Sequence, residues 1–143
     1  MYRAKVTKNT TPKEWYDHIV AAYNAGSFPS YGMKGGKFNY EGCLYRGGEK
    51  ACVVGIAIPD NKYEEFMDTG EKGEKYFCIN GSSVIEYLGK ENYPDFFFNR
   101  NEDGFFIDAL QRVHDKHADD KVLFDANFLT DLKNKFIEYG FEV

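Results

Sequence analysis

Residues 43–58, CLYRGGEKACVVGIAI, decide the fold. Two apolar segments flank the polar turn sequence GGEK at residues 47–50, which is the pattern of a β-hairpin. The second segment, residues 51–58, is apolar on both faces, so we expect a central strand that is covered on both sides. Pro59 and Asp60 follow and end this strand.

The register of the hairpin has two alternatives. A two-residue turn puts Cys43 opposite Cys52, whereas a four-residue turn puts Tyr45 opposite Cys52. Side chains alternate between the faces of a strand, so either register leaves both cysteines on the face that also carries Tyr45 and Val54. We therefore expect the two thiols on one face, reduced and largely buried.

Helical patterns lie outside the hairpin. Thr11 and Glu14 form a capping box with a proline between them, and Gly26 can end the helix that begins there. Two further helices are expected over about 103–117 and 127–139. Residues 27–40 read as an irregular loop, and residues 76–79 as a third strand.

These elements predict a single α+β domain over residues 1–143. Its core is a small, mostly antiparallel sheet with the hairpin at about 41–58 in the centre, and the N-terminal and C-terminal helices pack on this sheet.

Charge, hydropathy and cysteine content exclude several classes of protein. The 143 residues carry a net charge of −5, which argues against a protein that holds nucleic acid with a basic surface, although Lys34 and Lys37 could form a local basic patch. The longest apolar run, 51–58, falls far short of the roughly 20 residues that span a bilayer. The odd number of cysteines (Cys43, Cys52 and Cys78) without a signal sequence favours reduced thiols. We expect a soluble cytoplasmic protein with no cofactor and no nucleic-acid or membrane partner.

Three stretches together resemble a known pattern. Residues 43–46 read C-x-Y-R, residues 52–63 read C-x-x-G-x-x-I-P-D-x-x-Y, and residues 110–115 read L-Q-x-x-H-D. In this combination the chain resembles a family of small uncharacterised proteins of bacteriophages and prophages. The resemblance implies a viral setting, with the host cytoplasm as the location, and a shared site region. It implies no reaction.

The first candidate site is a metal centre. Cys43 and Cys52 share a predicted face, and His114 and His117 lie one helical turn apart, which makes four ligands of the kind that zinc prefers. The two thiols are eight residues apart, however, whereas structural zinc sites usually take one pair of ligands from a short knuckle. Buried cysteines also often serve only to pack. We therefore expect no metal.

The second candidate is a cysteine nucleophile, Cys43 or Cys52, with His114 as its base. His114 lies on the shoulder of the apolar stripe of its helix and can face the hairpin. Asp115 points away from that stripe, so we do not expect it to orient His114 in a triad. Cys52 and His114 remain the candidate catalytic residues, and the simpler alternative is a histidine that binds the backbone at the edge of the core.

The third candidate is Arg46. Its strand neighbours are apolar, and a guanidinium in such a place pairs with a carboxylate or binds an anion in a bidentate manner. We favour an internal partner, Asp60 above all, and keep an anionic ligand as the alternative. The candidate residues for binding a ligand or partner are Arg46, Tyr45, Asp60, Tyr63 and His114.

Aromatic residues are more abundant than a small sheet requires. Residues 93–98, Phe105 and Phe106 either form an exposed contact surface or fill the core between the helices. The contact surface, the acidic charge and the lack of a catalytic signature favour a phage-encoded accessory protein. It would bind a host protein, as an inhibitor, or sequester a small anionic ligand. The alternative function is a small Cys/His-dependent hydrolase or transferase.

Overall fold

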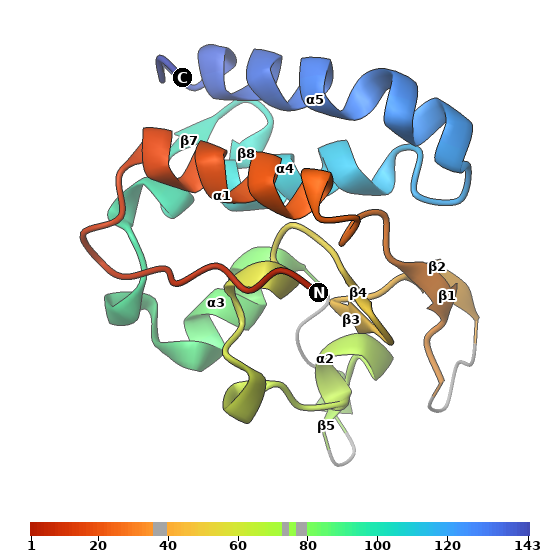
Figure 1. Ribbon diagram of the computed structural model, residues 1–143. Coiled ribbons are helices and arrows are strands. Elements are labelled where there is room, and N and C mark those ends of the chain that lie inside the picture. Colours follow the sequence, from red (N-terminus) through yellow and green to blue (C-terminus); the bar gives the residue numbers. More distant parts are fainter. Residues whose placement is uncertain (36–39, 73–74, 77–79) are drawn as a thin grey trace.

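Helices and short strand pairs alternate along the chain, as Figure 1 shows for the computed structural model, which describes residues 1–35, 40–72, 75–76 and 80–143. The α-helices are α1 (Pro12–Asn24), α2 (Phe66–Thr69), α3 (Gly81–Gly89), α4 (Phe106–Asp115) and α5 (Lys121–Glu138). Single 3-10 turns are η1 (Gly55–Ala57), η2 (Asp60–Lys62), η3 (Lys90–Asn92) and η4 (Asp95–Phe98). The antiparallel strand pairs are β1 (Tyr31–Met33) with β2 (Glu41–Cys43), β3 (Arg46–Gly47) with β4 (Lys50–Ala51), β5 (Glu71–Lys72) with β6 (Lys75–Tyr76), and β7 (Arg100–Asn101) with β8 (Gly104–Phe105). The expected α+β class is confirmed.

The first helix, α1, begins where the sequence predicts. The Thr11 hydroxyl accepts a hydrogen bond from the Glu14 backbone N–H at 3.2 Å, and the Glu14 carboxylate accepts one from the Thr11 N–H at 3.0 Å. This capping box satisfies backbone donors that the first turn leaves without partners. The helix ends as the chain turns at Gly26, which adopts a φ of +76°.

The hairpin is present as β3 and β4, with Arg46 opposite Ala51. This is the register of the four-residue-turn alternative. Cys43, however, belongs to the separate ribbon β1–β2, where it lies opposite Tyr31. The expectation that Cys43 and Cys52 share one face of a continuous hairpin is therefore wrong, because the chain changes partner strand between them.

The apolar run 51–58 is buried, as expected, but it is not the central strand that its pattern predicts. Only its first residue, Ala51, lies in a strand, and the chain then winds into the 3-10 turn η1. Gly55 makes this turn possible, because a Cβ at that position would lie 1.9 Å from the carbonyl oxygen of Tyr45. A run that is apolar on every side has no period that distinguishes a strand from a buried turn.

Two other segments depart from the expected secondary structure. The supposed loop 27–40 contains β1, and the ribbon β1–β2 forms one edge of the molecule in Figure 1. The third strand expected at 76–79 coincides with the described structure only at the end of β6, and residues 77–79 lie outside the described part of the chain.

Aromatic side chains join the helices of the upper half of the molecule, where Figure 1 shows α1 and α5 side by side. The Tyr16 and Phe136 ring centroids are 5.3 Å apart, and those of Phe106 and Phe136 are 4.9 Å apart.

α5 begins about a turn and a half before its predicted start, because Asp120 caps it by accepting from the Leu123 N–H. No helix among the described residues is long and apolar enough to cross a membrane.

The aromatic run 93–98 belongs to this core. Tyr93 and Phe97 are buried, and Phe96 and Phe98 pack against the core cluster. Phe106 is fully buried as well, whereas Phe105 is half-buried against Phe98. These residues fill the space between helices, so the contact-surface interpretation of the run is wrong.

Arg46 connects the hairpin to the segment that follows it. Its side chain, 12% exposed, donates from Nε to the Gly55 carbonyl at 3.1 Å and from a terminal nitrogen to the Ile58 carbonyl. The other terminal nitrogen forms an ion pair with Asp60 at 2.7 Å. The hydrogen bonds from Arg46 and then Arg3 lower the pKa of the Asp60 carboxyl. The expected internal partner of Arg46 is thus confirmed.

We predict that Arg46→Ala lowers the free energy of unfolding by about 1–3 kcal/mol, because it leaves two carbonyl groups and a carboxylate without their charged donor. Urea denaturation measures this loss. Arg3→Ala is the matched control, since Arg3 binds the same Asp60 carboxylate from an exposed position, and its loss should stay under about 1 kcal/mol. Equal losses in the two variants would contradict a special role for Arg46.

Candidate functional site

A cavity of about 380 Å³ lies between the ribbon β1–β2, the hairpin, α2, the start of α3 and one face of α4. Its charged lining residues in the described part of the chain are Lys34, Asp68, Asp108, Arg112 and Asp115. Both described cysteines, Cys43 and Cys52, also line it, although they come from different ribbons. The cavity therefore collects polar groups from segments that lie far apart in the sequence.

Helix α4 supplies the longest wall of the cavity. Residues 108, 111, 112 and 115 line it, at the spacing of one helical face. A neighbouring face carries Phe106 and Leu110 into the core. The amphipathic pattern of α4 thus fixes at once which residues anchor the helix and which residues face the cavity.

His114 is fully buried behind this wall. Its ring lies between Phe28 and Phe124, with centroid distances of 5.7 and 5.5 Å. The Ser30 backbone N–H donates to Nε2 at 3.1 Å. Because a backbone N–H is always a donor, Nε2 must present its lone pair, and the ring proton of the neutral imidazole lies on Nδ1.

Asp115 accepts a hydrogen bond from the Nδ1–H group of His114. Its Oδ1 lies 2.9 Å from His114 Nδ1 and 2.7 Å from Gln111 Nε2, and Gln111 Oε1 accepts from the Val54 N–H at 3.0 Å. The expectation that Asp115 cannot orient His114 is wrong. A helical wheel gives only the directions in which side chains leave the helix, whereas the Asp115 carboxylate, at the last residue of α4, reaches sideways to its neighbour.

Both described thiols are held in their neutral form. Burial raises the pKa of the Cys43 thiol, and the Asp115 carboxylate, to which it hydrogen-bonds, raises it further. Burial also raises the pKa of the Cys52 thiol, and Cys52 Sγ accepts from the Gly55 N–H at 3.3 Å. A nucleophilic cysteine needs a nearby cation or a free imidazole nitrogen to form its thiolate. Lys34 acts on Cys43 in that direction, but burial and Asp115 outweigh it. His114 offers no free nitrogen, since both of its nitrogens are already hydrogen-bonded.

The predicted four-ligand metal set is not assembled. Among the described residues, the group that comes together is Cys43, His114 and Asp115, whose ligand atoms lie within 4.8 Å of one another, while Cys52 and His117 are not part of it. A metal on Nδ1 would require the proton to move to Nε2, where the Ser30 N–H already points. The hydrogen-bond polarity around His114 therefore opposes metal binding.

Asp68 is the buried carboxylate of the cavity wall. It accepts hydrogen bonds from the backbone N–H groups of Tyr45 and Arg46, at 2.6 and 3.3 Å, and from the Tyr63 hydroxyl. Burial raises the pKa of Asp68, and these donors oppose that shift. Asp68 thus holds the hairpin in place, and its oxygens are engaged by the protein itself.

The predicted binding residues separate into two groups. Arg46, Asp60 and Tyr63 lie together, with the Arg46 guanidinium 5.9 Å from the Tyr63 ring, and they are not among the described residues that line the cavity. Tyr45 lines the cavity, and His114 supports it from behind. The anionic-ligand interpretation of Arg46 is therefore not the one that the structure favours.

Sequence reasoning missed the polar residues that dominate the cavity, namely Lys34, Asp108, Gln111, Arg112 and Asp115. A signal for those on α4 was available, because they recur at helical spacing beside the apolar stripe. Lys34 had no such signal, since its placement depends on the pairing of β1 with β2.

No family model matches the chain, and no curated protein or solved structure matches it either. Membership of the phage-protein family stays a prediction, and we infer the chemistry of the cavity from its own residues.

We predict that iodoacetamide modifies Cys43 slowly in the native protein at about pH 7.5, because the raised pKa leaves little thiolate. Asp115→Asn removes the negative charge and keeps an acceptor oxygen for His114, so the pKa of Cys43 should fall. The rate should then rise about tenfold for each unit of that fall. Peptide-resolved mass spectrometry measures the rate at each cysteine.

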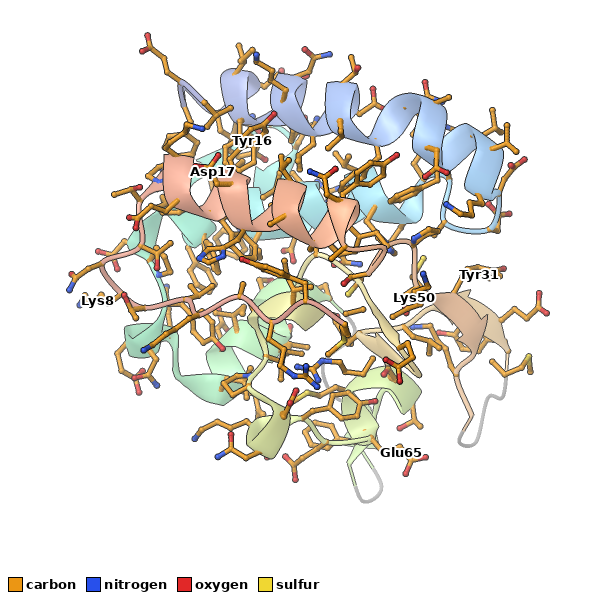
Figure 2. All side chains as sticks on the ribbon, viewed as in Figure 1. Lys8, Tyr16, Asp17, Tyr31, Lys50 and Glu65 are labelled. Atoms are coloured by element: carbon orange, nitrogen blue, oxygen red, sulfur yellow. The ribbon has the colours of Figure 1, made fainter. Side chains whose placement is uncertain are left out.

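The matched control is Asp17→Asn, an equal charge change on the exposed side of α1 (Figure 2). It should leave the rate of Cys43 modification unchanged. Rapid modification of Cys43 in the unaltered protein would contradict the neutral thiol and revive the cysteine-nucleophile hypothesis.

Proposed function

We propose that the protein binds a small organic cation, a protonated amine, against Asp115 in the α4 cavity, and that it sequesters this ligand without transforming it. The observation that carries the proposal is the set of hydrogen bonds that hold the Asp115 carboxylate on the cavity lining. Its Oδ1 receives hydrogen bonds from both His114 and Gln111, and the Cys43 thiol also hydrogen-bonds to this carboxylate, so the protein holds it in a fixed position on the cavity lining.

Rigidity supports a binding role for this carboxylate. His114 is locked between aromatic rings, and Gln111 is fixed by the Val54 N–H, so both donors to Asp115 are held by the core. The Asp115 side chain is itself 39% exposed and lines the cavity. A pre-positioned carboxylate loses little conformational entropy when a ligand arrives, and this favours affinity.

The charge around the cavity supports a cationic group. Asp108 shares the α4 wall with Asp115, and its Oδ1 is held by the Ser82 N–H at 2.7 Å. Asp68 of α2 adds a third carboxylate, whereas the described cations of the lining are Lys34 and Arg112. A site with this excess of carboxylates attracts ammonium groups and disfavours simple anions.

The chemistry of the neighbouring groups supports binding over catalysis. The thiols are neutral, and His114 has no lone pair available for a substrate proton, because Nε2 already accepts from Ser30. A Cys/His-dependent mechanism needs a thiolate or a free imidazole nitrogen within reach of the substrate. The hydrolase or transferase alternative therefore has less support than a binding protein.

We predict that n-pentylammonium chloride binds saturably and shifts the amide NMR signals of α4 and β2. Asp115→Asn should weaken this binding at least about tenfold, about 1.4 kcal/mol, because the charge is lost while the shape and the acceptor for His114 remain. Titration followed by ¹H–¹⁵N correlation spectra measures both dissociation constants.

Asp17→Asn again serves as the control, since it removes the same charge from α1, and it should bind like the unaltered protein. Equal affinity in the Asp115 variant, or no saturable binding of pentylammonium at all, would overturn the proposed function.

A further inference from the structure

Lys34 is one of the two cations that line the cavity in the described part of the chain. Its side chain is half-buried, and its only described ring contact is with Tyr40, whose centroid lies 5.9 Å from Nζ. No carboxylate of the described residues forms an ion pair with it. Lys34 acts on the Asp68 carboxylate from a distance, and a half-buried ammonium with no carboxylate in direct contact can pair with the anionic group of a ligand.

Packing holds Lys34 toward the cavity. Its stem crosses Gly42 so closely that a Cβ on that residue would lie 2.6 Å from Lys34 Cε. Its charge acts on two residues that line the cavity, Cys43 and Asp68, since it opposes the upward pKa shift that burial imposes on both. The stem of Lys34 thus packs against the β1–β2 ribbon at Gly42.

Arg112 is a weaker candidate for the same role. Its side chain is exposed, and one terminal nitrogen donates to the Asp103 carbonyl outside the cavity. In the described part of the cavity, the α4 wall with Asp108 and Asp115 is the acidic wall, since Arg112 on it bonds outside the cavity, and Lys34 next to β1 is the half-buried cation.

We propose that the ligand is a zwitterion, a small amino acid whose ammonium group binds Asp115 and whose carboxylate binds Lys34. This inference rests on the proposed function and adds the second charged group of the ligand. A cavity of about 380 Å³ accommodates a molecule of this size. Charge complementarity at both ends selects amino acids over simple amines and over simple carboxylic acids.

Three probes of the same length test the inference: 5-aminopentanoate, n-pentylammonium and pentanoate. We predict that 5-aminopentanoate binds about tenfold more tightly than pentylammonium and that pentanoate binds most weakly, because it meets the acidic wall without an ammonium group. Isothermal titration calorimetry measures the three constants. The ω-amino acids from glycine to 6-aminohexanoate are titrated in parallel, so that one unsuitable length does not decide the result.

Lys34→Met should abolish the advantage of the zwitterion while leaving pentylammonium binding unchanged or stronger. Lys133→Met removes a lysine from the exposed face of α5 and should preserve the advantage. Circular dichroism and urea denaturation verify that both variants are folded.

The outcomes separate the two proposals. If pentylammonium binds but no amino acid of the series binds more tightly, or if the advantage survives Lys34→Met, the zwitterion inference is overturned and the proposed function stands. If no probe binds, both are overturned.

Discussion

The hydrogen bond from the Ser30 backbone N–H to His114 Nε2 determines which groups of the site donate hydrogen bonds and which accept them. Because a backbone N–H can only donate, the ring proton lies on Nδ1 and points at Asp115. Gln111 approaches the same carboxylate oxygen, and its own carbonyl accepts from the Val54 N–H. One continuous chain of hydrogen bonds thus joins the segment after α1, the end of α4 and the start of η1. Breaking any link would leave a buried polar group without a partner, which costs more than the bond itself contributes.

The C-x-Y-R and L-Q-x-x-H-D motifs have separate structural roles. The C-x-Y-R half provides Arg46, which ties the hairpin to Asp60 and to two carbonyl groups, and the backbone N–H groups that hold Asp68. The L-Q-x-x-H-D half provides Gln111, His114 and Asp115, which form the wall of the cavity and its support. The first half stabilises the fold around the cavity, and we assign ligand binding to the second.

The limits of sequence prediction in this chain have physical causes. The α1 cap was predictable, because it depends on two residues only three positions apart in the sequence. The pairing of Arg46 with Asp60 was also predictable, because a charged side chain in an apolar segment needs a partner of opposite charge. The strand expected at 51–58 was not, since an apolar run without alternation fits a buried turn equally well. Asp115 was misjudged for a different reason: its role depends on Gln111 one turn earlier and on the Ser30 backbone, which no pattern in the sequence brings together.

The most direct test of this account is the tautomer of His114, read from long-range ¹H–¹⁵N correlation spectra at about pH 8, where an ordinary imidazole is neutral. The His18→Gln and His117→Gln variants assign the signals. We expect a protonated Nδ1 and a bare Nε2 at His114, and we expect both to be retained in Asp115→Asn. A protonated Nε2 in the unaltered protein would contradict it, because the Ser30 N–H would then face another donor and the Asp115 carboxylate would lose the bond that positions it.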